Sequence, residues 1–405
     1  MTLPADSDTQ RMPVRYWIWL LGAAVSLLGD LTMMFGIGWS ASHYGGRTAG
    51  LVLLVAAAPR AALLLIGGAV GDRFGAPRVL LLSCVSMFLL TLVLVPATMA
   101  AGEPVWLLLA TALAVGVIDA FFLPSSRSMP RLLVPAEQVP RALASFQVTG
   151  VVFAVTGTAV GGFLVSWSGL TAAAGFDALT FAAMIVVLLL LRGTTAPHGA
   201  VRTGMFRSIA DGVKMAFGRP LTRALLITMT VAAGLLMPLD QLVLPLLARD
   251  HNWNAATAGL LVASRSLGVG VIALRILTRG AFQRPGLVAA FGLLLAGVGL
   301  TGLASLDRLP LTIAAAVVSG IGVGTFTGHV LPLLMNSVER EYQSRLQSVV
   351  VLCQSLALVV MNPLLGIVAD LSGVGITGVC LGFGIASVAV GLVALSRQVL
   401  RDATV

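Results

Sequence analysis

The chain has 405 residues, of which 58% are apolar and only 10% are charged, and its mean hydropathy is +1.00. Because soluble domains carry about 25% charged residues, this composition excludes a soluble globular domain, and it equally excludes a disordered chain or a disulfide scaffold. The net charge is +9, but the basic residues are scattered singly through short loops and form no nucleic-acid-binding patch. The three cysteines lie in apolar runs without metal-ligand spacing, so neither a metal site nor a disulfide is expected.

Twelve long apolar segments predict an all-α integral membrane protein, because a spanning helix needs about 20 apolar residues. They cover residues 16–40, 48–71, 77–100, 104–127, 142–168 and 170–192, and then 221–247, 256–277, 285–305, 309–335, 345–370 and 375–396. The longest polar interruption separates two sets of six and contains a segment, Phe206–Phe217, whose apolar residues recur at helical spacing. We therefore expect an N-terminal six-helix bundle (1–192), a cytoplasmic linker with a short amphipathic helix (193–220) and a C-terminal six-helix bundle (221–405).

The distribution of basic residues predicts the orientation of these helices. With the N-terminus in the cytoplasm, 20 of the 25 basic residues fall on the inner side, 3 on the outer side and 2 within the membrane. Cytoplasmic loops are enriched in lysine and arginine, so both termini are expected in the cytoplasm. The first apolar run is too long for a cleavable signal peptide. The 24 arginines and single lysine suggest a high-GC bacterial genome, and hence a bacterial cytoplasmic membrane.

The two sets of helices repeat a short pattern. The sequence Thr-Ala-Gly-Leu opens the second helix at 48–51 and the eighth helix at 257–260. In each half an aspartate precedes this pattern and an arginine follows it: Asp30 and Arg60 in the first, Asp240 and Arg265 in the second. A duplicated six-helix unit is typical of transporters that rock two bundles around a central site.

The loop between the second and third helices carries a glycine- and charge-rich sequence. Its residues Gly68, Asp72, Arg73, Gly75 and Arg78 follow the spacing G-x-x-x-D-R-x-G-x-x-R, which resembles the signature loop of the major facilitator superfamily. In that family the loop locks the two bundles together on the cytoplasmic side in one state. We expect Gly68 to allow close helix packing, Gly75 to form a turn with positive φ, and Asp72 to sit at the positive end of a neighbouring helix. The corresponding loop at 279–284 has lost the acid, so such a latch would be one-sided.

Two further stretches resemble a branch of this family. Residues 116–147, with Asp119 followed by Ala-Phe-Phe-Leu-Pro, look like those of macrolide-efflux and enterobactin-export proteins. The fifth helix resembles the glycine-rich antiporter motif of drug exporters, with Thr158 where a proline is usual. Its glycines are Gly157, Gly161 and Gly162. The drug exporters' arginine in the fourth helix is replaced by Ala112, so the resemblance does not carry over their proton relay.

Asp30 and Arg60 both fall near the middle of their helices. An ionisable group there costs about 2.5–3.5 kcal/mol on insertion scales, so each needs a partner or a role. We expect the two to pair, so that protonation of Asp30 releases Arg60 and changes which conformation is stable. The alternative is a purely structural ion pair.

Five other polar groups are expected inside the helices. Asp240 and Arg265 would form a second pair nearer the outer face, and Asp119 would pair with an arginine of an inner loop. Asp177 is expected to be solvated near the outer start of its helix. His329 would either titrate near neutral pH or serve in helix packing.

The sequence narrows the mechanism to a carrier. A phosphate loop needs a Gly-Lys-Ser/Thr sequence, but the only lysine, Lys214, lies between Val213 and Met215, which excludes a pump driven by such a loop. The four histidines are far apart and form no enzymatic cluster. The duplicated halves and the bundle-locking loop favour a carrier over a channel.

We therefore expect a proton-coupled exporter that is monomeric, with no cofactor and no nucleic-acid partner, in contact only with lipid, protons and a small-molecule substrate. The family's cavity-lining helices are here mainly apolar, which suits an amphipathic drug or secondary metabolite. The polar exceptions are Asp30, Asp119, Asp240, Gln241 and His329. A siderophore or other metabolite exporter or importer, and a non-transporting receptor with this fold, remain as alternatives.

Overall fold

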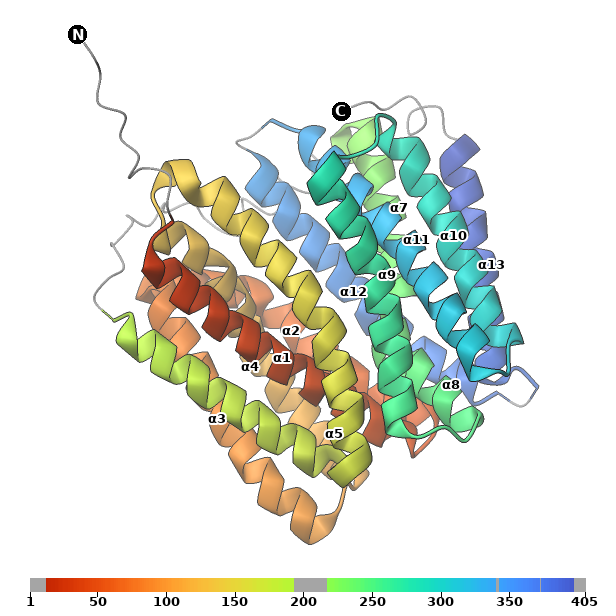
Figure 1. Cartoon of the computed structure of the whole chain (residues 1–405), viewed down its shortest axis with the longest axis horizontal. Helices are drawn as coiled ribbons and strands as arrows, with labels where there is room; N and C mark the ends of the chain where they lie inside the picture. The colour runs from red at the N-terminus through yellow and green to blue at the C-terminus, as the bar shows by residue number, and fades with distance from the viewer. Residues whose placement is uncertain (1–11, 193–216, 340–341, 372, 397–405) are drawn as a thin grey trace.

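The computed structural model describes residues 12–192, 217–339, 342–371 and 373–396. These residues form helices joined by short turns, without strands, as expected (Figure 1). The expected linker helix at Phe206–Phe217 lies almost wholly outside the described residues. Helices dominate because a chain in lipid must satisfy its backbone hydrogen bonds within each segment.

The N-terminal half begins with four helices that each exceed the thickness of a bilayer core. They are α1 (Val14–Ser42), α2 (Gly46–Phe74), α3 (Ala76–Ala101) and α4 (Val105–Leu133). The fourth extends six residues beyond the predicted end at 127. A short turn, η2 (Ala136–Gln138), then leads into α5 (Val139–Leu190).

The element α5 consists of two membrane-spanning arms that are joined at a break in the helix. Its 52 residues would measure about 78 Å as a straight helix, far more than the roughly 30 Å of a bilayer core. The backbone leaves the helical conformation at Ser168 and Gly169, and Gly169 has a φ of +60°. Glu103 accepts a hydrogen bond from the Leu170 backbone N–H at 2.6 Å and so caps the start of the second arm. Eleven apolar helices of the described chain are long enough to span a membrane, and this break makes twelve passes.

The C-terminal half supplies the other six passes. They are α7 (Pro220–Leu236) continued through η3 (Leu239–Val243) and α8 (Leu244–Asp250), and then α9 (Ala255–Arg279), α10 (Pro285–Ser305), α11 (Leu309–Asn336), α12 (Gln343–Ala369) and α13 (Gly375–Ser396). The element η3 is one π-helical turn, which interrupts the span that was predicted as a continuous helix at 221–247. Such turns are frequent at functional sites.

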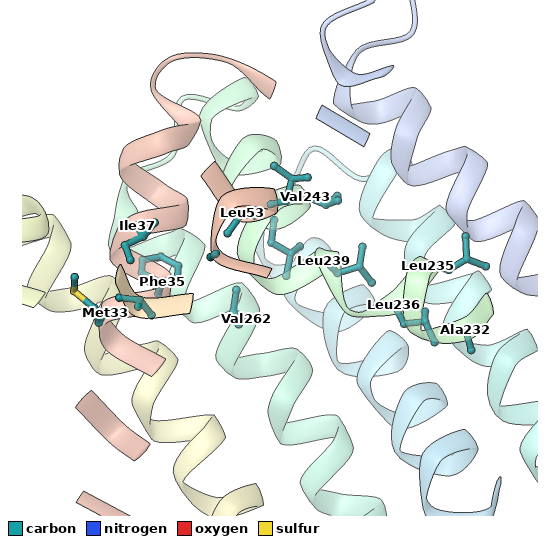
Figure 2. Packing of buried hydrophobic residues seen from close by; sticks show 14 of the residues in the cluster. Met33, Phe35, Ile37, Leu53, Ala232, Leu235, Leu236, Leu239, Val243 and Val262 are labelled. Carbon is teal, nitrogen blue, oxygen red and sulfur yellow. The ribbon is translucent and has the colours of Figure 1, made fainter. Parts of the chain in front are cut away.

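The two halves meet where α1 ends and α2 begins, together with α8, the start of α9 and the end of α12. We call this the closed end, toward the bottom of Figure 1, and the opposite end the open end. The apolar core continues across this junction: Leu239 and Val243 of η3 lie beside Leu53 of α2 and near Val262 of α9 (Figure 2).

The repeated Thr-Ala-Gly-Leu pattern marks two crossings between the halves. A Cβ atom on Gly50 of α2 would lie 2.5 Å from the Asn362 carbonyl oxygen of α12. A Cβ atom on Gly259 of α9 would lie 2.6 Å from the Gly162 Cα of α5. Both glycines therefore allow two helix backbones to touch, which explains why the pattern occurs once in each half.

Candidate transport site

The N-terminal half buries a group of charged side chains at mid-height. Arg60 of α2 places Nη1 3.9 Å from Oδ2 of Asp119 in α4, and their side chains are 26% and 14% exposed. Arg60 and Asp119 each lie fourteen residues into their helices, so the pair lies near the middle of the span. The predicted partners were therefore wrong: Arg60 pairs with Asp119 and not with Asp30, and Asp119 pairs with a helix residue and not with an inner-loop arginine.

Asp30 of α1 lies in the same region without an ion pair. Within the described part of the chain it makes no hydrogen bond or salt bridge, but the carboxyl groups of Asp177 and Asp119 are close enough to interact with its charge. Three carboxyl groups thus lie within electrostatic range of one another, and Arg60 pairs with Asp119 among them. The sequence could not show this, because pairing depends on how four helices rotate about their axes.

Asp177 corrects a second expectation. It is completely buried rather than solvated, and Thr180 lies 3.5 Å from its Oδ1, while Oδ2 has no hydrogen-bond partner. The second arm of α5 approaches α1 so closely that a Cβ atom on Gly29 would lie 2.5 Å from Asp177 Oδ1. Gly29 directly precedes Asp30, so this glycine is the sequence signal that points to a neighbour at that level.

The C-terminal half carries the predicted pair of Asp240 and Arg265. Arg265 Nη1 lies 2.6 Å from both carboxylate oxygens of Asp240, and Nη2 donates to the Leu236 carbonyl at 2.8 Å. The arginine side chain is 5% exposed, whereas that of Asp240 is 32% exposed. The π-helical turn η3 carries the carboxylate to this position, so the acid is the more accessible partner of the pair.

A cavity of about 360 Å³ opens beside this pair. It extends from Asp240 and Arg265 to Gln147 of α5 and Gln354 of α12, which lie nearer the open end. The rest of its wall is mostly apolar and comes from α5, α7, α9 and α11: Gly150, Val151, Ala154, Met229, Ala232, Ala233, Leu236, Met237, Ser266, Val269, Val323, Phe326 and Thr327. Both halves therefore contribute to one apolar chamber with a carboxylate in its wall.

Of the five polar residues expected on the cavity-lining helices, Asp240 alone lines this chamber. Asp30 and Asp119 belong to the charged group of the N-terminal half, and the other two lie elsewhere. The Gln241 carbonyl packs against Gly38 of α1, because a Cβ on that glycine would collide with it, and Gln241 does not line the chamber. His329 is 1% exposed and its Nδ1 lies 2.8 Å from the Thr325 carbonyl. Its Nε2 accepts a hydrogen bond from the Phe282 backbone N–H at 3.2 Å, so His329 fastens the α9–α10 loop to α11.

The signature loop at 68–78 lies at the open end. Gly75 has a φ of +90°, as predicted. Gly68 has no atom within 4 Å of a built Cβ; its neighbour Gly67 makes the close approach, to the Ala120 carbonyl, so the expectation for Gly68 was wrong. Asp72 is exposed and has no hydrogen bond or ion pair with a described residue. Unlike Asp72, the two arginines of the signature loop have identified neighbours. Arg73 lies over the Phe74 ring, and Arg78 lines a lateral cavity of about 740 Å³ together with Arg192.

The glycine motif of α5 serves packing. Gly157 and Gly161 face α1, where a built Cβ would lie 2.9 Å from Leu31 Cβ and 3.1 Å from Thr32 Cα, respectively. Gly162 instead faces α9 of the other half. The motif thus joins α5 to one helix in each half.

Comparison with known proteins agrees with this architecture. The sequence profile of the Major Facilitator Superfamily matches residues 19–361. The multidrug efflux pump Tap of Mycolicibacterium fortuitum is 25% identical over 340 residues, which cover 78% of this chain and 80% of that protein. A protein of the same name from Mycobacterium tuberculosis H37Rv is 24% identical over 407 residues, covering 95% and 93%.

Solved transporters share the fold at low identity. A POT family transporter in complex with 5-aminolevulinic acid has a TM-score of 0.75 at 13% identity, over 95% of this chain and 96% of that one. A bacterial homologue of the human drug peptide transporters PepT1 and PepT2 has a TM-score of 0.69 at 13% identity, over 94% and 98%. With the profile match over most of its length, this multi-pass membrane protein belongs to the Major Facilitator Superfamily.

Proposed function

We propose that this protein is a proton-coupled exporter of amphipathic, cationic drugs or secondary metabolites. The observation that carries the proposal is the accessible Asp240 carboxylate in the wall of an otherwise mostly apolar chamber. The relatives named as multidrug efflux pumps support the same class of substrate.

The chamber suits a ligand with a cationic group and a hydrophobic body. Arg265 holds Asp240 in place from the buried side, so the exposed part of the carboxylate remains for a positive group. Met229, Met237 and Phe326 offer polarizable and aromatic surface, which adapts to ligands of different shape. A sugar would need many more hydrogen-bonding partners than this wall provides.

The carboxyl group of Asp30 is the proposed proton carrier. It lacks a basic partner among the described residues, and the charges of Asp177 and Asp119 act on it, so a proton on Asp30 relieves the repulsion among three acids. Only Asp119 is held by Arg60. One proton that moves through about 150 mV releases about 3.5 kcal/mol, which sustains a gradient of a few hundredfold for a neutral substrate. Export of a monovalent cation in exchange for one proton moves no net charge, so the pH gradient alone drives that exchange.

The positive-inside distribution supports an orientation in which the open end faces the cytoplasm of a bacterial cell, with both termini there. The structure then represents the state in which the chamber is reached from the cytoplasm. The protein acts as a monomer, because each chain contains the complete chamber.

The experiment is a drug-susceptibility panel in a pump-deficient bacterial host, followed by transport of the most affected drug in proteoliposomes. We expect expression to raise resistance to cationic amphipathic drugs, and an uncoupler to abolish drug accumulation against its gradient. Direct binding without any flux would instead indicate a receptor. Uphill transport that persists with the uncoupler would contradict proton coupling.

A further inference from the structure

Two polar contacts at the closed end join the N-terminal half to the C-terminal half. Asp370 follows directly after α12, and its two carboxylate oxygens accept hydrogen bonds from the backbone N–H groups of Gly46 and Arg47, at 2.7 and 2.8 Å. The first N–H groups of a helix have no partner within the helix, and its N-terminus carries a partial positive charge. Asp370 therefore caps α2 from the opposite half of the molecule.

The second contact lies at the end of α1. Arg249 of α8 donates from Nε to Ser42 Oγ at 2.6 Å and from Nη2 to the Trp39 carbonyl at 2.9 Å. Its guanidinium carbon lies 4.1 Å from the centre of the Trp39 ring. A cation thus lies at the C-terminal end of α1, which carries a partial negative charge, and this too stabilises the helix end.

These contacts depend on the halves staying together at this end. Gly46 fits because it has no side chain: a Cβ atom would lie 2.6 Å from the Gly366 carbonyl oxygen and 2.9 Å from Asp370 Oδ1. If the halves separate here, the start of α2 loses its contact with Asp370, and the end of α1 loses its contact with Arg249. Both charged side chains then become hydrated. Each contact therefore favours the closed arrangement over an open one.

We propose that Asp370 and Arg249 form a closed-end latch, a pair of positioning residues that sets how often the transporter opens at that end. The inference rests on the alternating-access part of the proposed function, but not on the substrate or on proton coupling. The latch is the counterpart of the signature loop at the open end, where Asp72 is exposed and makes no polar contact with a described residue. A negative charge near α2 is thus available at each end of the molecule.

The test measures opening directly, by electron-spin distance measurement on the full chain in lipid nanodiscs without substrate. Spin labels are placed at Ala101 of α3 and Leu311 of α11, two exposed positions of the closed end in opposite halves, after Cys84, Cys353 and Cys380 are replaced by alanine. Asp370→Ala is compared with Asp307→Ala. Asp307 is 92% exposed at the same end, and it pairs with His251 within its own half.

We expect Asp370→Ala to raise the ratio of long to short distances roughly three- to thirtyfold, as loss of a helix cap predicts, and Asp307→Ala to leave it unchanged. Arg249→Gln provides an independent arm in case Asp370→Ala fails to fold, and we expect it to shift the ratio in the same direction. Unchanged distances in the folded latch variants would overturn the latch. Failure of drug transport in the unmodified protein would overturn the proposed function instead.

Discussion

At the scale of single residues, Asp30 differs from the other acids of its group in having no hydrogen bond or salt bridge with a described residue. We expect Asp30→Asn to preserve folding and drug binding, because the amide has the same shape and no ion pair is lost. It should abolish uphill transport, because the amide cannot exchange a proton. The measurement is drug accumulation in proteoliposomes with an imposed pH gradient. Asp307→Asn is the control, and full gradient-driven transport by Asp30→Asn would refute the assignment.

Substitutions of Asp240 can separate its effect on the stability of the folded protein from its effect on the binding of cationic drugs. Asp240→Asn leaves the Arg265 guanidinium buried without its counter-ion, which costs about 3–5 kcal/mol when a buried pair is broken. We expect a marked fall in the thermal unfolding temperature, and restoration of most of it in the double variant Asp240→Leu/Arg265→Met, which removes both charges.

The same double variant tests recognition of the substrate. We expect it to lose affinity for cationic drugs while it retains affinity for neutral hydrophobic ones, measured by equilibrium binding to the purified protein. Equal affinity for the cations in the double variant and the wild type would exclude Asp240 as their partner.

At the scale of helices, the crossing of α5 and α9 makes a further prediction. Gly162→Ala places a methyl group 2.7 Å from the Gly259 Cα. Because this atom belongs to the backbone of α9, the clash can be relieved only if α5 or α9 shifts as a whole. We expect this variant to push the halves apart and to enrich long distances between Ala101 and Leu311. Gly382→Ala in α13 is the matched control: its new methyl group meets no atom within 4 Å, and alanine is the better helix former. An unchanged distance distribution in Gly162→Ala would show that this contact does not resist opening.

The same elements show what could be predicted from the sequence. The twelve passes followed from the apolar runs, and the predicted break between 142–168 and 170–192 coincides with the non-helical backbone at Ser168 and Gly169. The Asp240–Arg265 pair was predicted correctly from two successive spans, but the same reasoning failed for Asp30 and Arg60, so succession of spans alone does not determine a pair. Asp177, by contrast, lies about 10 Å past the start of its arm, and its burial depends on the rotation of that arm against Gly29 of α1. Pairing among four helices is a property of packing and not of sequence order.

At the scale of the whole molecule, α2 runs from the closed end to the open end and has an acidic side chain near each of its own ends. Its start is capped by Asp370, and near its other end Asp72 makes no hydrogen bond or ion pair with a described residue. In the proposed rocking motion, one end of the molecule closes as the other opens. A bond formed by Asp72 when the open end closes therefore requires loss of the Asp370 bonds at the closed end. The two acids therefore act on one conformational equilibrium in opposite directions.

This opposition yields the last prediction. We expect Asp72→Ala to favour the present state and so to lower the ratio of long to short distances between Ala101 and Leu311, whereas Asp370→Ala raises it. Drug affinity should change little in Asp72→Ala, because the residue lies far from the chamber, but turnover should fall. Since the two acids are at opposite ends of α2 and share no partner, their effects on the logarithm of the ratio should add. The double variant should thus return toward the wild-type distribution, and a double variant that matches either single variant would show that the ends are not coupled through one rocking motion.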